Sequence, residues 1–512
     1  MPSKSQRVSK SIFIGTATLI ALLIILLVFF FPAFSQVVKG ALSFLCYDIG
    51  WLFIITVIVI ALFCVYLAFS RLGNIKLGGK NEPKQYSNFA WASMMFTTGL
   101  GTALVVMSYI EPVMFLENPP FGIEPLSDEA FEFALVPDQF LYGILAWLIY
   151  VPGVVAIGLA LYSRNERRLR ISSACKPVIG KHADRGSGKL IDILGNIAII
   201  GGVSSALGLG VPIVTMLVNR LTGIPEGVWL TVAVLAIWTL LFGTSVYMGL
   251  DKGIKRLSLF NIYLFGAIII FIATVNPVNQ AISMWVNSLG LMLDSFGKLA
   301  FGTDPFGKSD FAQGWVVFYW AWWLAFAPMM GLFVARISRG RTIRQIIGGM
   351  ICFGALPCMA CFAWFGSYAV TLQHEGIVDL VTTLSTVGRE EVFFTILETM
   401  PLAPFIEAAY IVLLFVFCAT TIDSTAYVVA STCIDNLGGD EQPPRWMRMV
   451  WAIALLLFAL GLVLTGGLDI LQAATVATAL PMVAIVVLLM ISAFRGLRDA
   501  TKLCNKAKVD IT

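Results

Sequence analysis

The feature that most constrains this chain is a series of uncharged apolar stretches, each about long enough to cross a lipid bilayer. Of its 512 residues, 58% are hydrophobic and 12% are charged, whereas soluble domains carry about 25% charged residues. A membrane-crossing helix needs about 20 apolar residues. In lipid every backbone polar group must be satisfied internally, which helices achieve. We therefore predict an all-α membrane protein that crosses the membrane many times.

Twelve spans can be placed on the sequence. They cover residues 12–33, 50–71, 88–115, 138–163, 190–219, 228–249, 257–276, 314–336, 344–368, 404–432, 446–466 and 469–494. The first run is too long for the apolar region of a signal peptide and has no small-residue cleavage site after it, so it is assigned as a span. An amphipathic segment at 280–299 is expected to lie along the membrane surface or in the membrane interface.

The loop charges predict the orientation independently. Basic residues cluster at both termini and in every second loop, for example at 164–170, 252–256 and 336–344. The intervening loops are acidic or neutral, as at 117–132 and 375–391. Positively charged loops stay in the cytoplasm. Both termini are therefore predicted to be cytoplasmic, which requires an even number of spans.

Groups for enzymatic chemistry are scarce. The two histidines, His182 and His374, fall in loops on opposite sides of the predicted membrane, and zinc-protease, P-loop and nucleophile-elbow motifs are absent from the sequence. The net charge of +4 is divided among loops, so no nucleic-acid partner is expected. Intramembrane carboxylates are candidates for function. Glu111 and Glu407 lie near span ends, where structural pairing is favoured, and Asp423 is expected to orient nearby hydroxyls or to pair with a basic residue.

One predicted span carries an unusual number of aromatic rings. Tyr319, Trp322, Trp323 and Phe326 follow the i, i+3, i+4, i+7 pattern of one helical face. Ring faces away from water attract a cation with no N–H to donate, such as a quaternary ammonium group. The alternative is that these rings only pack against neighbouring helices.

Several spans contain residues that interrupt helices. Thr97–Thr102 reads TTGLGT, residues 201–205 read GGVSS and residues 208–212 read GLGVP, while the tenth span contains Thr420 and Thr421. Unwound backbone and hydroxyl oxygens together can bind sodium in a transporter. The alternatives are close helix packing at the glycines and hydroxyls that bond to their own preceding turn.

The run from Phe318, FYWAWW followed by ARISRGRTIR, resembles the signature of the betaine/carnitine/choline transporter family. The resemblance covers nearly the whole chain, from NPPFG at 118–122 to STC at 431–433. Within the family the chain resembles both the carnitine/γ-butyrobetaine exchangers and the sodium-coupled glycine betaine symporters.

The resemblance implies the five-plus-five inverted-repeat fold of the leucine-transporter type with two extra N-terminal helices. The implied division is 1–87 for the N-terminus and peripheral helices, 88–276 for the first repeat, 277–313 for the amphipathic connection, 314–494 for the second repeat and 495–512 for a short basic cytoplasmic tail. It also implies a homotrimer in the bacterial plasma membrane.

The family's aromatic box, a cage of rings near the bilayer midplane, would be formed here by Trp322, Trp323, Phe326, Tyr142 and Tyr150. The sequence departs from the family where Phe-His-Trp-Gly is replaced by Phe-Leu-Tyr-Gly at 140–143, and where an eighth-span tryptophan is Phe326. The unwound third-span segment would contain Gly99, Leu100 and Gly101, which contact the substrate in the family.

The resemblance also implies sodium sites and no organic cofactor. Thr420 and Thr421 would bind sodium with Thr97 and Leu100, and Ser204 and Ser205 would belong to a second site. Asn261 stands where sodium-independent exchangers have an arginine, whereas Met330 matches those exchangers.

We therefore predict a secondary active transporter, not an enzyme, for quaternary ammonium or sulfonium compounds such as glycine betaine, carnitine or choline. We predict that transport is sodium-coupled symport. The alternatives are a sodium-independent substrate:product antiporter and, from another class, a polytopic membrane enzyme or a channel.

Overall fold

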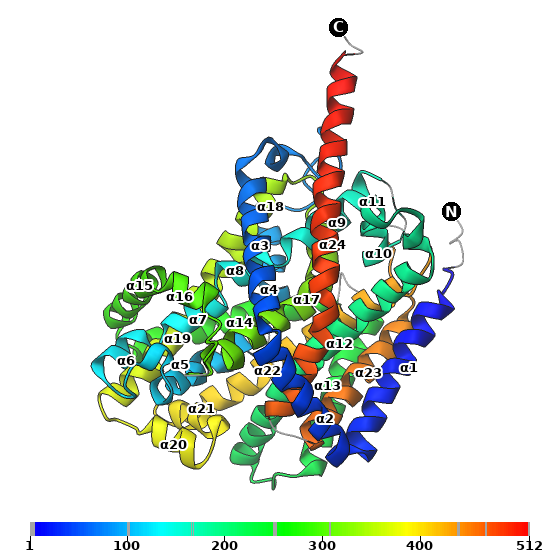
Figure 1. The fold of residues 1–512 in the computed structure, drawn as a ribbon. Helices are drawn as coiled ribbons and strands as arrows, with labels where there is room; N and C mark the ends of the chain where they lie inside the picture. The colour runs from blue at the N-terminus through cyan, green and yellow to red at the C-terminus, as the bar shows by residue number, and fades with distance from the viewer. Residues whose placement is uncertain are drawn as a thin grey trace.

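All regular elements in the described part of the protein are helices. The computed structural model describes residues 6–99, 103–164, 166, 168–248, 253–306, 309–437, 441–465 and 468–509. Within these ranges the only β pairing is two isolated bridges, one joining Val8 to Ile434 and one joining Lys76 to Thr342. The predicted all-α class is therefore confirmed (Figure 1).

The first half of the chain forms both short and long helices. Its elements are α1 Lys10–Phe29, α2 Phe31–Ser43, η1 Phe44–Asp48, α3 Gly50–Phe69, η2 Arg71–Asn74, α4 Asn88–Gly99, η3 Ala103–Met107, α5 Ser108–Glu117, η4 Pro120–Gly122, α6 Asp128–Phe133, α7 Val136–Leu141, α8 Ile144–Leu148, α9 Val151–Tyr162, α10 Ile171–Ala174, α11 Lys176–Ile179, η5 Gly180–Asp184, α12 Gly186–Thr222 and α13 Val228–Met248.

The second half contains the longest continuous helix, α24. Its elements are α14 Gly253–Val275, α15 Val278–Asp294, α16 Phe296–Phe301, η6 Ala312–Val317, α17 Phe318–Ile337, α18 Ile343–Gly349, η7 Met350–Ala355, α19 Leu356–His374, α20 Leu380–Thr386, α21 Arg389–Glu398, α22 Ala403–Thr432, α23 Arg445–Thr465 and α24 Leu468–Val509. The C-terminal part of α24 projects beyond the bundle in Figure 1.

Nine helical stretches in the described ranges are long and apolar enough to cross a membrane. They coincide with nine of the twelve predicted spans. The third span comprises α4, η3 and α5, and residues 100–102, between α4 and η3, lie outside the described residues. The apolar part of α13, Val228–Leu241, is shorter than a full span, and Leu259–Val275 counts as a tenth span only together with α15. The number twelve therefore stays a prediction.

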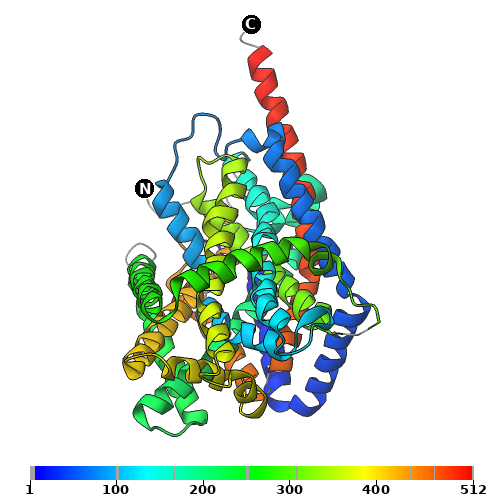
Figure 2. The same cartoon turned by 90° about the vertical axis from the view of Figure 1, so that its left-hand side faces the viewer.

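The predicted amphipathic segment is helical and bends sharply away from the helix before it. The axes of α14 and α15 meet at 105°, and α15 runs across the bundle in Figure 2. Pro277 at the corner has no N–H to continue the helix. The amide of Asn276 fastens the corner to α19, because it donates to Trp364 O at 3.1 Å and to Ser367 Oγ at 3.0 Å.

The glycine-rich fifth span is one continuous helix, so the expected interruption at 201–212 is wrong. This helix, α12, packs against α17, α22, α23 and α24. A Cβ at Gly201 would lie 2.3 Å from Thr478 Oγ1, and one at Gly208 would lie 2.5 Å from Leu471 Cδ2. The glycines therefore serve close helix packing of the kind found in membrane bundles.

The arginines that follow the aromatic span tie the loop after α17 to the ends of α3 and α4. The Arg341 guanidinium lies 4.0 Å from the Trp91 ring centroid and donates to Asn88 Oδ1 at 2.8 Å. Arg344 donates to Ala68 O at 2.7 Å and to Asn74 Oδ1 at 2.9 Å. This motif therefore has a structural role in holding segments that are distant in sequence.

Candidate substrate site

Trp323 on α17 is surrounded by three aromatic rings from the segment that contains α7, α8 and α9. Its ring centroid lies 6.0 Å from that of Tyr142, 6.2 Å from that of Trp147 and 5.8 Å from that of Tyr150. The ring planes meet at 82°, 50° and 54° respectively. The four side chains are buried. This aromatic cluster therefore combines ring faces from two parts of the chain.

Breaks between the short helices place these rings. Tyr142 follows the last residue of α7, and Tyr150 precedes the first residue of α9. Gly143 lies between α7 and α8, where a Cβ would be 2.1 Å from Gln139 O. Only glycine fits this turn without a shift of the backbone, so the local sequence directs the Tyr142 ring towards α17.

The other two predicted box residues of α17 lie beside α12. Trp322 donates from Nε1 to Gly202 O at 3.2 Å, and its ring centroid is 6.4 Å from that of Phe326. A Cβ at Gly202 would lie 3.3 Å from Cδ2 and Cε2 of Phe326. Tyr319 connects the two groups, since its ring lies 5.8 Å from Trp322 and 5.1 Å from Tyr142.

A buried polar network adjoins the cluster. The Tyr142 hydroxyl donates to Glu111 Oε1 at 3.1 Å, Tyr319 donates to the same oxygen, and the two phenol oxygens are 2.8 Å apart. Glu111 is therefore held by hydrogen bonds from two phenols inside the protein. Asp138, which the sequence reasoning overlooked, is also fully buried here.

Trp147 is the aromatic residue of the cluster that the sequence reasoning missed. It precedes Tyr150 by three residues, a spacing that places two side chains on one face of a helix. That spacing was the available signal. The ring lies directly on the backbone of η7, because a Cβ at Gly354 would be 2.2 Å from Trp147 Cε3.

We expect Gly354→Ala to raise the substrate concentration for half-maximal uptake by about tenfold. The added methyl must displace the fully buried Trp147 ring, and overpacking a buried site typically costs 1–3 kcal/mol, where about 1.4 kcal/mol corresponds to tenfold. Gly348→Ala is the matched control, because a Cβ there meets nothing within 4 Å. Equal uptake curves for the two folded variants would show that substrate binding does not depend on the position of the Trp147 ring.

The predicted unwound segment is only partly described. Gly99 is the last residue of α4, and the backbone of Thr97 is helical. Leu100 and Gly101 lie outside the described residues. Their predicted contacts with substrate and sodium therefore stay predictions.

The two threonines of the tenth span bond to their own helix. Thr420 Oγ1 donates to Phe417 O at 2.8 Å, and Thr421 Oγ1 donates to the same carbonyl oxygen at 3.0 Å. A hydroxyl that donates its hydrogen keeps oxygen lone pairs that can accept or ligate. The bonds are those of the back-bonded alternative, and they leave both oxygens able to face a cation.

Ser204 and Ser205 point to different helices. Ser204 Oγ donates to Leu455 O on α23 at 3.1 Å. Ser205 Oγ lies 2.7 Å from Thr475 Oγ1 on α24 and donates to Gly201 O at 2.8 Å. Thr475 is thus a further hydroxyl residue beside the predicted second sodium site, and only the tertiary structure brings it there.

Asp423 pairs with a basic residue, which was one of the two roles expected for it. Arg448 Nη2 on α23 lies 2.5 Å from Asp423 Oδ1, and the two side chains are 1% and 0% exposed. Asn261, at the position of the exchangers' arginine, is buried on α14, and Met330 is buried on α17.

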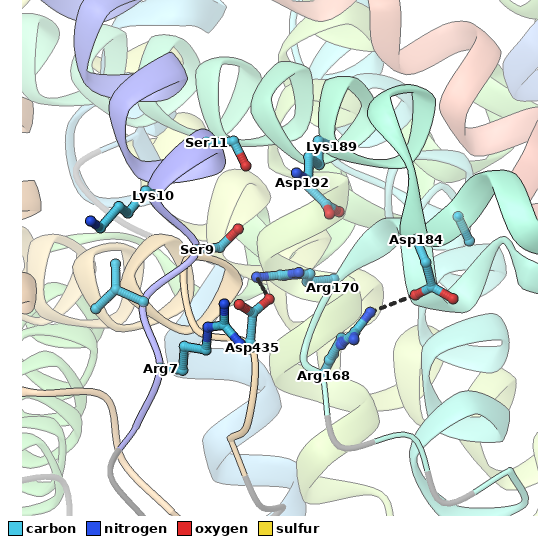
Figure 3. Close-up of a pocket in the computed structure, with 12 residues that line it drawn as sticks. Arg7, Ser9, Lys10, Ser11, Arg168, Arg170, Asp184, Lys189, Asp192 and Asp435 are labelled. Atoms are coloured by element: carbon cyan, nitrogen blue, oxygen red, sulfur yellow. Dashed lines mark hydrogen bonds and ion pairs between the residues drawn. The ribbon is translucent and has the colours of Figure 1, made fainter.

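A polar pocket of about 510 Å³ shares no lining residue with the aromatic cluster. It lies between the N-terminal segment, the loop before α10 and the first turns of α12 (Figure 3). Arg170 pairs with Asp435 at 3.0 Å and donates to Thr432 O at 2.7 Å. Asp435 N in turn donates to Arg7 O at 2.8 Å. These bonds attach the N-terminal segment to the end of α22.

The membrane-length helices and the buried aromatic cluster between them indicate a multi-pass membrane protein of the transporter class. The model of the betaine/carnitine/choline family transporters matches residues 11–502. The chain belongs to this family.

Named relatives extend over most of the chain. It is 32% identical to the glycine betaine transporter OpuD of Bacillus subtilis, over 93% of this chain and 91% of that protein. It is also 32% identical to glycine betaine transporter 1 of Vibrio parahaemolyticus, over 88% and 86%. Identity to a carnitine transporter of Acinetobacter baumannii is 30%, over 83% and 78%. These relatives are transporters, and the chain is accordingly a transporter, not an enzyme.

Proposed function

We propose that this protein is a secondary active transporter for a quaternary ammonium or sulfonium compound such as glycine betaine, carnitine or choline. The observation that carries the proposal is the enclosure of Trp323 by Tyr142, Trp147 and Tyr150, at centroid distances of 5.8–6.2 Å. A methylated cation has no N–H to donate. It therefore loses few hydrogen bonds when it leaves water for a wall of ring faces, which attract it through their quadrupoles.

A carboxylate on the substrate would complement one feature of this cluster. The indole Nε1 of Trp323 is a buried donor with no acceptor among the described residues. An unsatisfied buried donor costs about 1–3 kcal/mol, and a carboxylate that reached it would remove that cost. We therefore propose that zwitterions such as glycine betaine or carnitine are preferred to choline.

The direct test is uptake of labelled glycine betaine by purified protein in liposomes, with carnitine, choline and dimethylsulfoniopropionate as competitors. A transporter gives saturable uptake and exchanges labelled for unlabelled substrate, whereas a channel does neither. Competition by choline stronger than competition by the zwitterions would contradict the proposed preference. Absence of saturable uptake for all four compounds would reject the transport function itself.

We further propose that transport is coupled to sodium. The hydroxyl oxygens of Thr420 and Thr421 retain lone pairs, and Ser204 and Ser205 supply further neutral oxygens. Sodium that holds the third and tenth spans together would favour the substrate-ready conformation. By linkage, sodium must then tighten substrate binding and substrate must tighten sodium binding by the same factor.

Replacing sodium by potassium or N-methylglucamine is expected to abolish accumulation of substrate. Thr421→Ala should raise the sodium concentration for half-maximal uptake more than it changes substrate selectivity. Uptake is measured in liposomes at fixed substrate, with the sodium gradient as the variable. The competing proposal is sodium-independent exchange. Undiminished uptake in sodium-free buffer that depends on preloaded substrate would establish exchange and exclude symport.

The remaining proposals concern the setting of the protein. Family membership and the bacterial relatives support a bacterial plasma-membrane location, and the charge pattern supports both termini in the cytoplasm. The start of α1, the end of α24 and the basic segments around α10, α11 and α18 lie in the upper part of Figure 1, whereas α21, which carries Glu390, Glu391 and Glu398, lies near the bottom. Family membership supports a homotrimer and the division into two inverted repeats.

A further inference from the structure

Two buried carboxyl groups lie together beside the aromatic cluster. Glu111 on α5 and Asp138 on α7 are 2% and 0% exposed, their helices pack against each other, and the two carboxyl groups interact electrostatically. Tyr142 links the pair to the cluster, because its hydroxyl bonds to Glu111 at 3.1 Å while its ring lies 6.0 Å from Trp323. The charge on the carboxyl pair therefore changes the electrostatic potential at the aromatic cluster.

The carboxyl pair lacks donors. Both carboxyl oxygens of Asp138, and Oε2 of Glu111, have no hydrogen-bond partner among the described residues. The two phenols, Tyr142 and Tyr319, both bond to the remaining oxygen, Glu111 Oε1. A buried carboxyl group without a hydrogen-bond donor is costly in free energy. A donor between these oxygens would remove that cost.

The surroundings offer little positive charge. Arg389 on α21 acts on Glu111 through Coulomb attraction, but its guanidinium bonds to Glu390 at 2.8 Å. From α19, Phe362 stacks on Tyr142 at 3.9 Å, and from α15, Trp285 donates to Gln139 at 3.2 Å. These two contacts carry no charge. On the other side of α5, the Tyr109 hydroxyl bonds to that of Tyr410 at 2.8 Å.

Two carboxylates in contact and away from water do not both ionise, so one proton is shared between them. Such a proton would supply the donor that the Asp138 oxygens lack. We propose that the Glu111–Asp138 pair is a proton-binding site, and that the quaternary ammonium group of a substrate bound at the aromatic cluster displaces this proton. The inference rests on the proposed function, because it requires a cation at the cluster.

The expected coupling follows from electrostatics. A cation against the Tyr142 ring stabilises negative charge on the carboxyl pair behind the phenol, in an environment of low dielectric constant. By reciprocity, the proton weakens the binding of the cation by the same factor that the cation weakens the binding of the proton. Coupling free energies between sites typically correspond to 5–150-fold, and we expect about tenfold here.

The experiment is calorimetric titration of the purified protein with glycine betaine, in buffers of different ionisation enthalpy, between about pH 5 and pH 8. We expect release of up to one proton per bound substrate, and affinity about tenfold weaker at the acidic end. Asp138→Asn should abolish the proton release and flatten the pH dependence of the dissociation constant. Glu129→Gln, which alters an exposed carboxylate on α6, should behave as the unmodified protein.

The outcomes distinguish failure of the proposed proton site from failure of the proposed transport function. Substrate binding whose heat is independent of the buffer would overturn the proton site and leave the proposed function intact. The proton site would also be overturned if Asp138→Asn, shown to be folded by its substrate-dependent thermal stabilisation, still released a proton. An Asp138-dependent response to sodium concentration and not to pH would show a metal-ion site instead. Absence of binding at every pH would reject the proposed function first.

Discussion

Trp323→Ala is expected to lose nearly all uptake, while Trp323→Phe retains a part of it. A desolvated cation–π contact is worth about 2 kcal/mol, which corresponds to roughly thirtyfold in affinity. Trp323 is also the ring that contacts Tyr142, Trp147 and Tyr150. Alanine therefore removes one ring of the aromatic cluster and leaves the three rings that packed against it without this contact. Phenylalanine keeps a smaller ring at the same position. The dissociation constant and the uptake rate of each variant are the measurements.

Trp229→Ala is the control for loss of a tryptophan. Its side chain is 87% exposed on α13, so we expect unchanged substrate affinity. Insertion and folding of both alanine variants are checked by size-exclusion chromatography in detergent. Normal affinity in a folded Trp323→Ala protein would exclude the aromatic cluster as the substrate site.

Arg448→Leu is expected to destabilise the protein by about 3–5 kcal/mol, because it removes the guanidinium that pairs with the buried Asp423 carboxylate. The two atoms of this pair lie 2.5 Å apart between α22 and α23, and the side chains are 1% and 0% exposed. Replacing both residues, as in Asp423→Leu with Arg448→Met, should recover most of the loss, since an apolar pair leaves no buried charge. The measurement is thermal unfolding in detergent of the unmodified protein, the Arg448→Leu variant and the double variant.

The matched control is an exposed ion pair. Arg168 and Asp184 also lie 2.5 Å apart, but their side chains are 37% and 45% exposed. Pairs of this kind contribute about 0–1 kcal/mol, so Arg168→Leu should unfold close to the unmodified protein. An equal loss in the two single variants, or no recovery in the double variant, would contradict a role of burial in the Asp423–Arg448 pair.

Local sequence predicted those features that depend on local chemistry. The length of an apolar run is set by bilayer thickness, and nine of the predicted spans coincide with membrane-length helices. The role of the glycines in α12 was harder to predict from the sequence, because glycine occurs both where a helix unwinds and where two helices approach closely. The neighbours Thr478 and Leu471, which decide for close approach, lie more than 250 residues away in the chain.

By itself, the sequence determined that this is a many-span, all-α membrane protein, that one span carries a stripe of rings, and that the chain resembles a transporter family. These properties follow from composition, from a helical repeat and from contiguous motifs. The tertiary structure was needed to show that Trp147 joins Trp323, that Asp138 lies beside Glu111, and that Arg448 pairs with Asp423. Each of these contacts joins separate elements, and its energy depends on burial and mutual distance, which arise only when the helices pack.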